Sequence, residues 1–515
     1  MTETSAATDR GWLGRVERLG NRLPDPVVIF LVLIGLLVAF SVWADWRGWS
    51  AVNPATGEEL RSQSLLTAEN VARLLVEMPA TLTGFPPLGL VLVVMLGAAV
   101  AERSGLFAAL IGRAMRNRSG RFLTPIVFVT GVMSHHASDA AYIVLIPLAA
   151  FIYAEAGRHP LAGAAAAYAG ISGAFAGNYL PGQFDVLMLG ITNASARLLA
   201  PDYVLNPLGN WWFTLAIGLA FIPIAWFVTD RIVEPRLGRW DRAGTPLALS
   251  EEAAAAASAD GAALRNAGFV ALAVVLVFAA LALVPGYTPL VDETAEGPGR
   301  YTPLYRALVA GFFLLFLLTG WAYGRKAGTI RGHRDVVSMM AGGMRAMAPY
   351  LVIVFFAAHF VTMFAWSNLG PVIAIGGAEW LRSLMLPHAV MLLMLLLVAA
   401  FFDIFIGSAS AKWTAMAPLV VPMLMLLGIS PEMATAAYRM GDSIFNIITP
   451  VATNFPLVLV ICQRWSKDFG VGSLIALMLP YSIAFAIGGL SLLVAWSSAG
   501  LPVGPAAPYA YELPQ

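Results

Sequence analysis

The sequence predicts an all-α polytopic membrane protein, built as an inverted repeat with nine transmembrane helices and two re-entrant hairpins. Hydrophobic residues make up 59% of its 515 residues and charged residues only 12%, against about 25% charged residues in an average soluble domain. Apolar runs such as 26–43 and 268–284 recur along the chain, and each approaches the roughly 20 residues that a helix needs to cross a bilayer. A similar order of apolar and polar segments occurs in both halves.

Charge and composition exclude several classes of protein. The formal net charge is +1, which gives no electrostatic basis for binding nucleic acid. The single cysteine, Cys462, cannot form an intrachain disulfide. No glycine-rich phosphate-binding loop occurs, so the sequence does not predict an ATP-driven pump.

The N-terminal segment, 1–25, sets the orientation of the chain. Its arginines precede the first apolar span, about 26–44, and basic residues near span ends mark the cytoplasmic side of a membrane. No signal-peptidase site follows this span, so we expect a retained helix rather than a cleaved signal. The predicted location is the bacterial inner membrane, crossed many times.

The first transmembrane half is predicted over 26–228. A span at about 86–101 returns to an Arg-rich cytoplasmic loop. Segment 122–154 then has two apolar arms around a polar centre, and each arm has only about 11 to 15 apolar residues, which is short for a bilayer crossing. We therefore favour a hairpin that enters and leaves from inside over a pair of full spans. Segment 161–200 runs outward with a Gly- and Pro-rich break at 177–182, and a span at about 210–228 returns.

A basic cytoplasmic linker, 229–265, leads to two connecting spans within 266–323, at about 266–285 and 306–323. The loop between these two spans is acidic and is predicted to lie outside.

The second half, 324–497, repeats this plan. A span at about 348–365 exits, and a second hairpin at 386–427 carries the polar centre 407–413. Segment 432–463 returns inward with a break at 446–450, and a span at about 471–497 leaves a periplasmic tail, 498–515.

A shift of 270 residues relates the two halves, because it places Tyr168 on Tyr438, Phe175 on Phe445 and Ser138 on Ser408. Chance explains part of this identity in Ala- and Leu-rich sequence. The repeated order of span, hairpin, broken helix and span is more specific. Inverted repeats with interrupted helices are typical of secondary transporters that work by alternating access, with substrate and ion sites near the membrane midplane.

Hairpin tips and helix breaks leave backbone N–H and C=O groups free to bind anions and cations. Na⁺ is predicted near Asn178 and Asn446, which can supply amide oxygens; the alternative is that these amides only satisfy the broken backbone. The hairpin and helix-break candidates are Ser138, Asp139, Asn178, Ser408, Ser410, Lys412, Asn446, Thr449 and Asn454.

Charged residues within spans are functional candidates because burying a charge at a helix centre costs about 2.5–3.5 kcal/mol even on lenient scales. Asp442 lies three residues after Arg439 on the same helical face, so the two either form a closed ion pair or serve a substrate or ion. Asp185 either binds an ion or proton or lies in a solvated outer vestibule. Lys412 either binds an anion or extends to the outer surface, and Trp413 either stacks on an aromatic substrate or only packs.

A metal site is the remaining alternative. His135, His136 and Asp139 cluster in the first hairpin, but adjacent histidines point to different sides of a helix and no HExxH spacing occurs. A metalloenzyme is therefore disfavoured, and no cofactor other than a coupling ion, Na⁺ or H⁺, is expected.

Several long motifs resemble the aminobenzoyl-glutamate transporter (AbgT) family. They are GVMSHHASDAAYIVLIPLAAFIY, GRHPLAGAAAAYAGISGAFAGNYL, FIGSASAKWTAMAPLVVPM and SPEMATAAYRMGDSIFNIITPVATNFPLVLV. The resemblance covers nearly the whole chain in order, and His135 and His136 are departures from it.

The resemblance implies a homodimer in the lipid bilayer, nine transmembrane helices and two hairpins per protomer, and no enzymatic activity. It implies transport of aminobenzoyl-glutamate-type folate catabolites, export of sulfonamide antimetabolites, or both. Transport of other organic anions, or Na⁺/H⁺ exchange, is the alternative. By similarity, the substrate or coupling-ion positions are Asp185, Trp413, Pro431, Arg439 and Asp442.

The predicted topology can be tested by single-cysteine labelling from each side of the membrane. We expect a cysteine near Ser138 to react from the cytoplasm and one near Ser408 to react from the periplasm. Labelling of both tips from the same side would contradict the inverted repeat.

Overall fold

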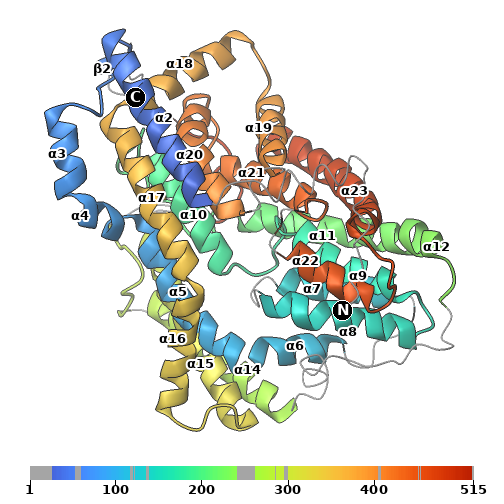
Figure 1. Cartoon of the computed structure of the whole chain (residues 1–515). Helices are drawn as coiled ribbons and strands as arrows, with labels where there is room; N and C mark the ends of the chain where they lie inside the picture. Colours follow the sequence, from blue (N-terminus) through green and yellow to red (C-terminus); the bar gives the residue numbers. More distant parts are fainter. Residues whose placement is uncertain are drawn as a thin grey trace, which may run out of the picture.

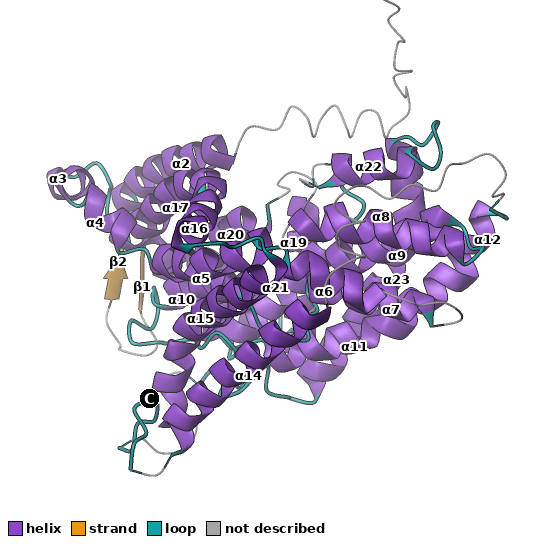
Figure 2. Cartoon of the chain, turned by 90° about the horizontal axis from the view of Figure 1, so that it is seen from below, coloured by secondary structure: helices purple, strands orange, loops and turns teal. Residues whose placement is uncertain are grey.

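Long apolar helices pack together with shorter, interrupted helices in the computed structural model (Figure 1). The structure describes residues 26–52, 59–115, 120, 122–134, 139–240, 261–284, 286–294, 300–403, 408–450, 452 and 454–512. His135, His136 and Ser138 lie outside these ranges. Viewed from below, helices make up almost all of what is described, apart from one small pair of strands (Figure 2).

Within the described residues, seven helices are long and apolar enough to cross a membrane. They are α2 (Pro26–Trp46), α11 with its continuations η3 and α12 (Trp211–Phe227, Val228–Val233 and Glu234–Leu237), α14 (Gly261–Leu283), α15 (Thr302–Ala327), α17 (Ala348–Trp366), α20 (Ala409–Leu426) and α23 (Val471–Ser498). Six of them coincide with predicted spans. The seventh, α20, falls inside the second predicted hairpin, so the count of nine spans and two hairpins stays a prediction.

The predicted span at 86–101 is helix α5 (Pro86–Arg103), and the chain bends by 60° after it into α6 (Leu106–Met115). Helix α5 packs tightly on α15, because a Cβ at Gly97 would lie 2.3 Å from the Phe313 carbonyl oxygen. Small residues allow membrane helices to approach this closely. With α2 and α17, these helices form one side of the molecule (Figure 1).

Helices flank both predicted hairpin centres. Helices α7 (Leu123–Met133) and α8 (Asp139–Glu155) flank the first centre, and α19 (His388–Asp403) and α20 flank the second. The Ser443 hydroxyl donates to the carbonyl of Gly173, 270 residues earlier. The same shift relates the last residues of α7 and α19 and the first residues of α8 and α20. The Ser443–Gly173 hydrogen bond therefore joins equivalent positions of the two repeats.

Both predicted breaks coincide with gaps between helices. The first segment consists of α9 (Pro160–Tyr168), one wider π-helical turn η2 (Ala169–Gly173) and, after an irregular stretch, α10 (Gln183–Ala196). The second consists of α21 (Pro431–Asn446) and α22 (Phe455–Gln463). Helix α21 begins where the Ser430 hydroxyl accepts from the N–H of Met433, with Pro431 in the first turn, a favoured way to start a helix.

Smaller elements, which the sequence did not indicate, complete the fold. They are β1 (Ser50–Val52) paired antiparallel with β2 (Glu59–Arg61), α3 (Ala68–Val76), α4 (Met78–Thr83), α16 (His333–Ala346) and α18 (Leu369–Ser383). The predicted linker 229–265 is helical at both ends, because α12 ends at Leu237 and α14 begins at Gly261. The C-terminal tail packs against the core, since the N–H of Ser430 donates to the carbonyl of Tyr509 at 3.0 Å.

Candidate functional site

Helix α21 carries the centre of the candidate site. It is polar for a membrane protein, and yet it is buried from Pro431 to Ile444. It packs against α10, α19 and α20, which come from both repeats. Its charged side chains must therefore find partners on neighbouring helices, because water is not available to solvate them.

Arg439 pairs with Asp185 across the two broken segments. The Arg439 Nη1 lies 2.7 Å from Asp185 Oδ1, and the two residues are only 2% and 3% exposed. The other carboxylate oxygen of Asp185 accepts from the Asn178 amide and from the N–H of Gly182, both at 2.8 Å. Asp185 thus caps the N-terminus of α10 and holds the first break in place while it neutralises an arginine of the second repeat.

The Arg439 guanidinium keeps hydrogen-bonding capacity that Asp185 does not use. Its Nε is buried and has no hydrogen-bond partner within the described part of the chain. One face of the group lies over the Phe184 ring, 5.2 Å from the ring centroid. Since a guanidinium has five N–H donors in a planar fork, Arg439 has donors left to bind a further carboxylate.

Lys412 forms a second buried cluster with two carboxylates. Its ammonium group contacts Asp403 and lies 2.7 Å from Asp442 Oδ1, and Lys412 is 0% exposed. The Tyr438 hydroxyl donates to the Ala409 carbonyl at 2.6 Å and approaches Asp442 at 3.4 Å. With all three groups ionised the cluster has one negative charge in excess, and Asp403 Oδ2 has no hydrogen-bond partner among the described residues. One proton or one monovalent cation would therefore neutralise the cluster.

Hydroxyl and aromatic contacts join α10, α20 and α21 between the two clusters. The Thr192 and Thr435 hydroxyls lie 2.6 Å apart, and the Trp413 Nε1–H donates to Thr192 at 2.9 Å. The Trp413 ring stacks on Tyr438 with centroids 4.4 Å apart. In this conformation one face of Trp413 is occupied by a neighbouring ring, which agrees with the packing interpretation of that residue.

Three sequence-based interpretations are wrong. Arg439 and Asp442 do not form a closed pair, because each binds a charge on another helix. Lys412 does not extend to the surface, and Asp185 does not lie in a solvated vestibule, since both are buried in ion pairs. Spacing along one helix cannot reveal partners that lie 254 residues apart, as Asp185 and Arg439 do.

The other candidates have different positions and roles. Ser408 caps the start of α20 and lies 3.4 Å from the Ser410 hydroxyl. Thr449 is buried and donates to the Asp403 carbonyl at 3.4 Å. Asn178 belongs to the Asp185 site, whereas Asn446 and Asn454 lie at helix ends and are half-buried. Pro431 starts α21, and Asp139 is the first residue of α8.

Sequence reasoning missed four residues of the site, namely Asp403, Thr192, Thr435 and Tyr438. Asp403 had a usable signal, because it is the single charged residue at the end of the apolar stretch HAVMLLMLLLVAAFFD, and charges in such stretches are functional candidates. The threonines had none, because a threonine within a helix usually bonds its own backbone.

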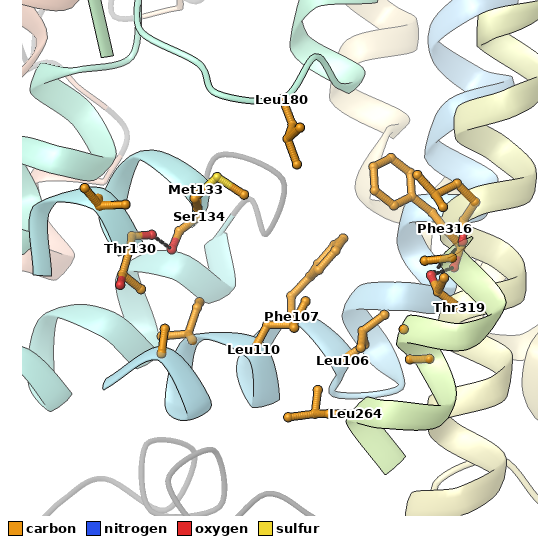
Figure 3. Close-up of a pocket in the computed structure, with 17 residues that line it drawn as sticks. Leu106, Phe107, Leu110, Thr130, Met133, Ser134, Leu180, Leu264, Phe316 and Thr319 are labelled. Carbon is orange, nitrogen blue, oxygen red and sulfur yellow. Dashed lines mark hydrogen bonds between the residues drawn. The ribbon is translucent and has the colours of Figure 1, made fainter. Parts of the chain in front are cut away.

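A separate cavity of about 520 Å³ lies between α6, α7, α14 and α15. Phe107, Leu110, Phe316 and Leu264 surround it, and Leu180 reaches towards it from the first break (Figure 3). Its hydroxyls are already satisfied, since Thr130 donates to the Ile126 carbonyl and Ser134 to the Thr130 carbonyl. No charged side chain occurs among the described residues that line this cavity, so we take the two ion-paired clusters as the candidate site.

The Lys412 cluster gives a stability prediction. Replacing Lys412 by Met leaves two buried carboxylates without their cation, and removing one partner of a buried pair costs about 3–5 kcal/mol. We expect a loss of this size in the free energy of unfolding, measured in detergent, and partial recovery in Lys412→Met/Asp403→Asn. Lys326→Met, at an exposed position at the end of α15, is the control. A double variant no more stable than Lys412→Met would contradict the charge balance.

Comparisons with known proteins agree with this fold. A sequence model of the AbgT putative transporter family matches residues 11–511. The chain is 35% identical to the p-aminobenzoyl-glutamate transport protein of Escherichia coli (strain K12) over 507 residues, which cover 98% of each chain. It is similar to the crystal structure of the Alcanivorax borkumensis YdaH transporter, with a TM-score of 0.86 and 38% identity over 94% of this chain and all of that one.

A second similar structure is that of Neisseria gonorrhoeae MtrF, described as illuminating a class of antimetabolite efflux pumps. Its TM-score is 0.88 and its identity 41%, over 97% of this chain and all of that one. These matches confirm the resemblance seen in the sequence motifs and extend over nearly every residue. The chain belongs to the AbgT family of membrane transporters.

Proposed function

We propose that the chain is an ion-coupled secondary transporter of aminobenzoyl-glutamate-type compounds, that it also exports sulfonamide antimetabolites, and that it works by alternating access as a homodimer in the bacterial inner membrane. The observation that carries the proposal is the buried Arg439–Asp185 pair, which joins the broken segments of the two repeats at 2.7 Å. The substrate class is supported by the E. coli relative, whose name specifies p-aminobenzoyl-glutamate transport.

Arg439 is the proposed carboxylate anchor. An aminobenzoyl-glutamate molecule carries two carboxylates, and arginine binds such groups through two parallel hydrogen bonds. An arriving carboxylate competes with Asp185 for the guanidinium. Loosening the Arg439–Asp185 contact also releases the carboxylate that caps α10, so substrate binding acts directly on the first break.

The Lys412 cluster is the proposed coupling site. Its excess negative charge favours uptake of one cation, H⁺ or Na⁺, and neutralising Asp442 or Asp403 weakens their hold on Lys412. Asp442 lies on the same helix as Arg439, less than one turn away. Ion binding at one cluster and substrate binding at the other therefore bias the position of the same element, which is the requirement for coupling.

Counterflow and gradient-driven uptake in proteoliposomes test the function. We expect labelled p-aminobenzoyl-glutamate to exchange across the membrane and to accumulate only with a Na⁺ or H⁺ gradient. Asp442→Asn should abolish accumulation while the folded variant remains in the membrane. Ion exchange without any organic substrate would instead favour a Na⁺/H⁺ exchanger, and transport of unrelated anions would favour a broader carrier.

Arg439→Lys tests the carboxylate assignment because it keeps the charge and loses the planar fork. We expect weaker binding of p-aminobenzoyl-glutamate by about tenfold, which corresponds to the loss of one charge-assisted hydrogen bond of about 1.4 kcal/mol. An uncharged sulfonamide should be affected much less. Equal losses for both ligands, measured by titration of the purified variant, would disprove the assignment.

A further inference from the structure

We infer that a groove along α10, distinct from the two ion-paired clusters, is a docking site for the carboxylate groups of an organic anion. The groove has a volume of about 570 Å³ and is lined by residues of α5, α10, α15 and the stretch after α10. Two arginines, Arg197 and Arg306, lie on it. The identity of the anion, an aminobenzoyl-glutamate-type substrate, rests on the proposed function.

Helix α10 presents different faces to the candidate site and to the groove. Asp185 and Thr192, seven residues apart, contact Arg439 and Thr435. Val186, Gly190 and Asn193 line the groove, at the spacing of residues that share one face of a helix. This face is turned by about 100° from the first, because successive residues in a helix are rotated by that amount. A ligand in the groove therefore contacts the helix that presents Asp185 to Arg439.

The charges of the groove are unbalanced. No acidic side chain occurs among the described residues that line it. Arg197 donates through Nε to the Tyr203 carbonyl at 3.0 Å, which fixes its position and leaves its terminal nitrogens available. The Arg306 side chain has no hydrogen bond or ion pair within the described residues, and both arginines are exposed. Two cations on one groove without a counter-charge repel each other, and an anion with two carboxylates relieves this repulsion.

The rest of the groove lining is apolar and suits the aromatic ring of such an anion. Leu90, Val93 and Leu189 provide apolar surface. Gly89 leaves the floor open, because a Cβ at this position would meet no atom within 4 Å. The Asn193 side-chain oxygen accepts from the N–H of Leu205 at 3.1 Å and holds the neighbouring loop against the groove. An aromatic carboxylate therefore matches both the charges and the apolar floor.

A water-soluble anion fits this groove better than an anionic lipid. The loop residues Val204, Leu205 and Pro207 line the end at which Arg197 lies, and the predicted topology places this end outside the membrane. Arg306 follows the predicted outer loop 286–303. A substrate arriving from that side meets the arginines first and then the helix that carries Asp185.

Binding of p-aminobenzoyl-glutamate to the purified full chain tests the groove. Arg197→Gln and Arg306→Gln should each weaken binding about three- to tenfold, since each removes one exposed charge-assisted contact. Uptake should show the same rise in KM with kcat unchanged. Binding of uncharged sulfanilamide should not change. Arg300→Gln, a nearby exposed arginine that does not line the groove, is the matched control and should bind like the unmodified chain.

Gly89→Leu provides a second variant that leaves all charges in place. Its side chain enters the open floor, so we expect weaker binding of p-aminobenzoyl-glutamate with normal folding. Unchanged affinity in all three groove variants overturns the inference, and so does the absence of binding to the unmodified chain. If the unmodified chain binds the anion and does not transport it, the proposed function fails while the groove variants still decide the docking site.

Nanodiscs of phosphatidylcholine, with and without phosphatidylglycerol, test the alternative that the groove binds an anionic lipid. Variants that lose only retention of phosphatidylglycerol, and bind p-aminobenzoyl-glutamate normally, would assign the groove to a lipid head group and overturn the inference.

Discussion

The buried ion pair between Arg439 and Asp185 is the interaction on which the arrangement of the two repeats depends. Both groups are buried, and an unpaired charge is far more costly there than at a surface. Asp185 also accepts the N–H of Gly182 and the amide of Asn178. One carboxylate therefore closes the first break, starts α10 and holds α21. Separation of this pair would therefore disturb all three.

The Lys412 cluster is a second set of buried charges that must be paired, but it contains two carboxylates and one ammonium group. Its three charges come from α19, α20 and α21, so the cluster holds these three helices together around the second polar centre. Two carboxylates share one ammonium group, so the cluster carries an excess negative charge when both carboxylates are ionised. A neutral ion pair would hold these helices together equally well. The excess negative charge is therefore the feature that favours the proposed ion binding.

Helix α10 connects the two inferred anion sites. Its first turn carries Asp185, its middle carries Thr192, and Arg197 follows its last residue. A rigid helix transmits a displacement at one end to the other, so a ligand on the groove face and a substrate at Arg439 act on a common element. The apolar cavity beside α7 lies next to the first break, from which Leu180 reaches towards it (Figure 3).

Local features of the sequence were sufficient to predict much of the fold. Apolar length located α2, α11, α14, α15, α17 and α23, because a helix in lipid must satisfy its backbone internally and expose apolar side chains. Gly and Pro residues predicted the breaks before α10 and after α21, and the sequence motifs predicted the family. The bend after α5, the helices α16 and α18 and the strand pair were not predicted, since amphipathic or short segments have no comparable signal.

The sequence by itself identified Asp185, Lys412, Arg439 and Asp442 as charges within membrane segments, but it left open whether Asp185 and Lys412 are buried, and the structure shows that both are. Only the tertiary structure decided their partners. Arg439 had Asp442 within one turn, and yet it binds Asp185, 254 residues away, while Asp442 shares Lys412 with Asp403. The physical reason is that side chains on one helix point outward from its axis, so the charges that neutralise them come from whichever helices pack against that face.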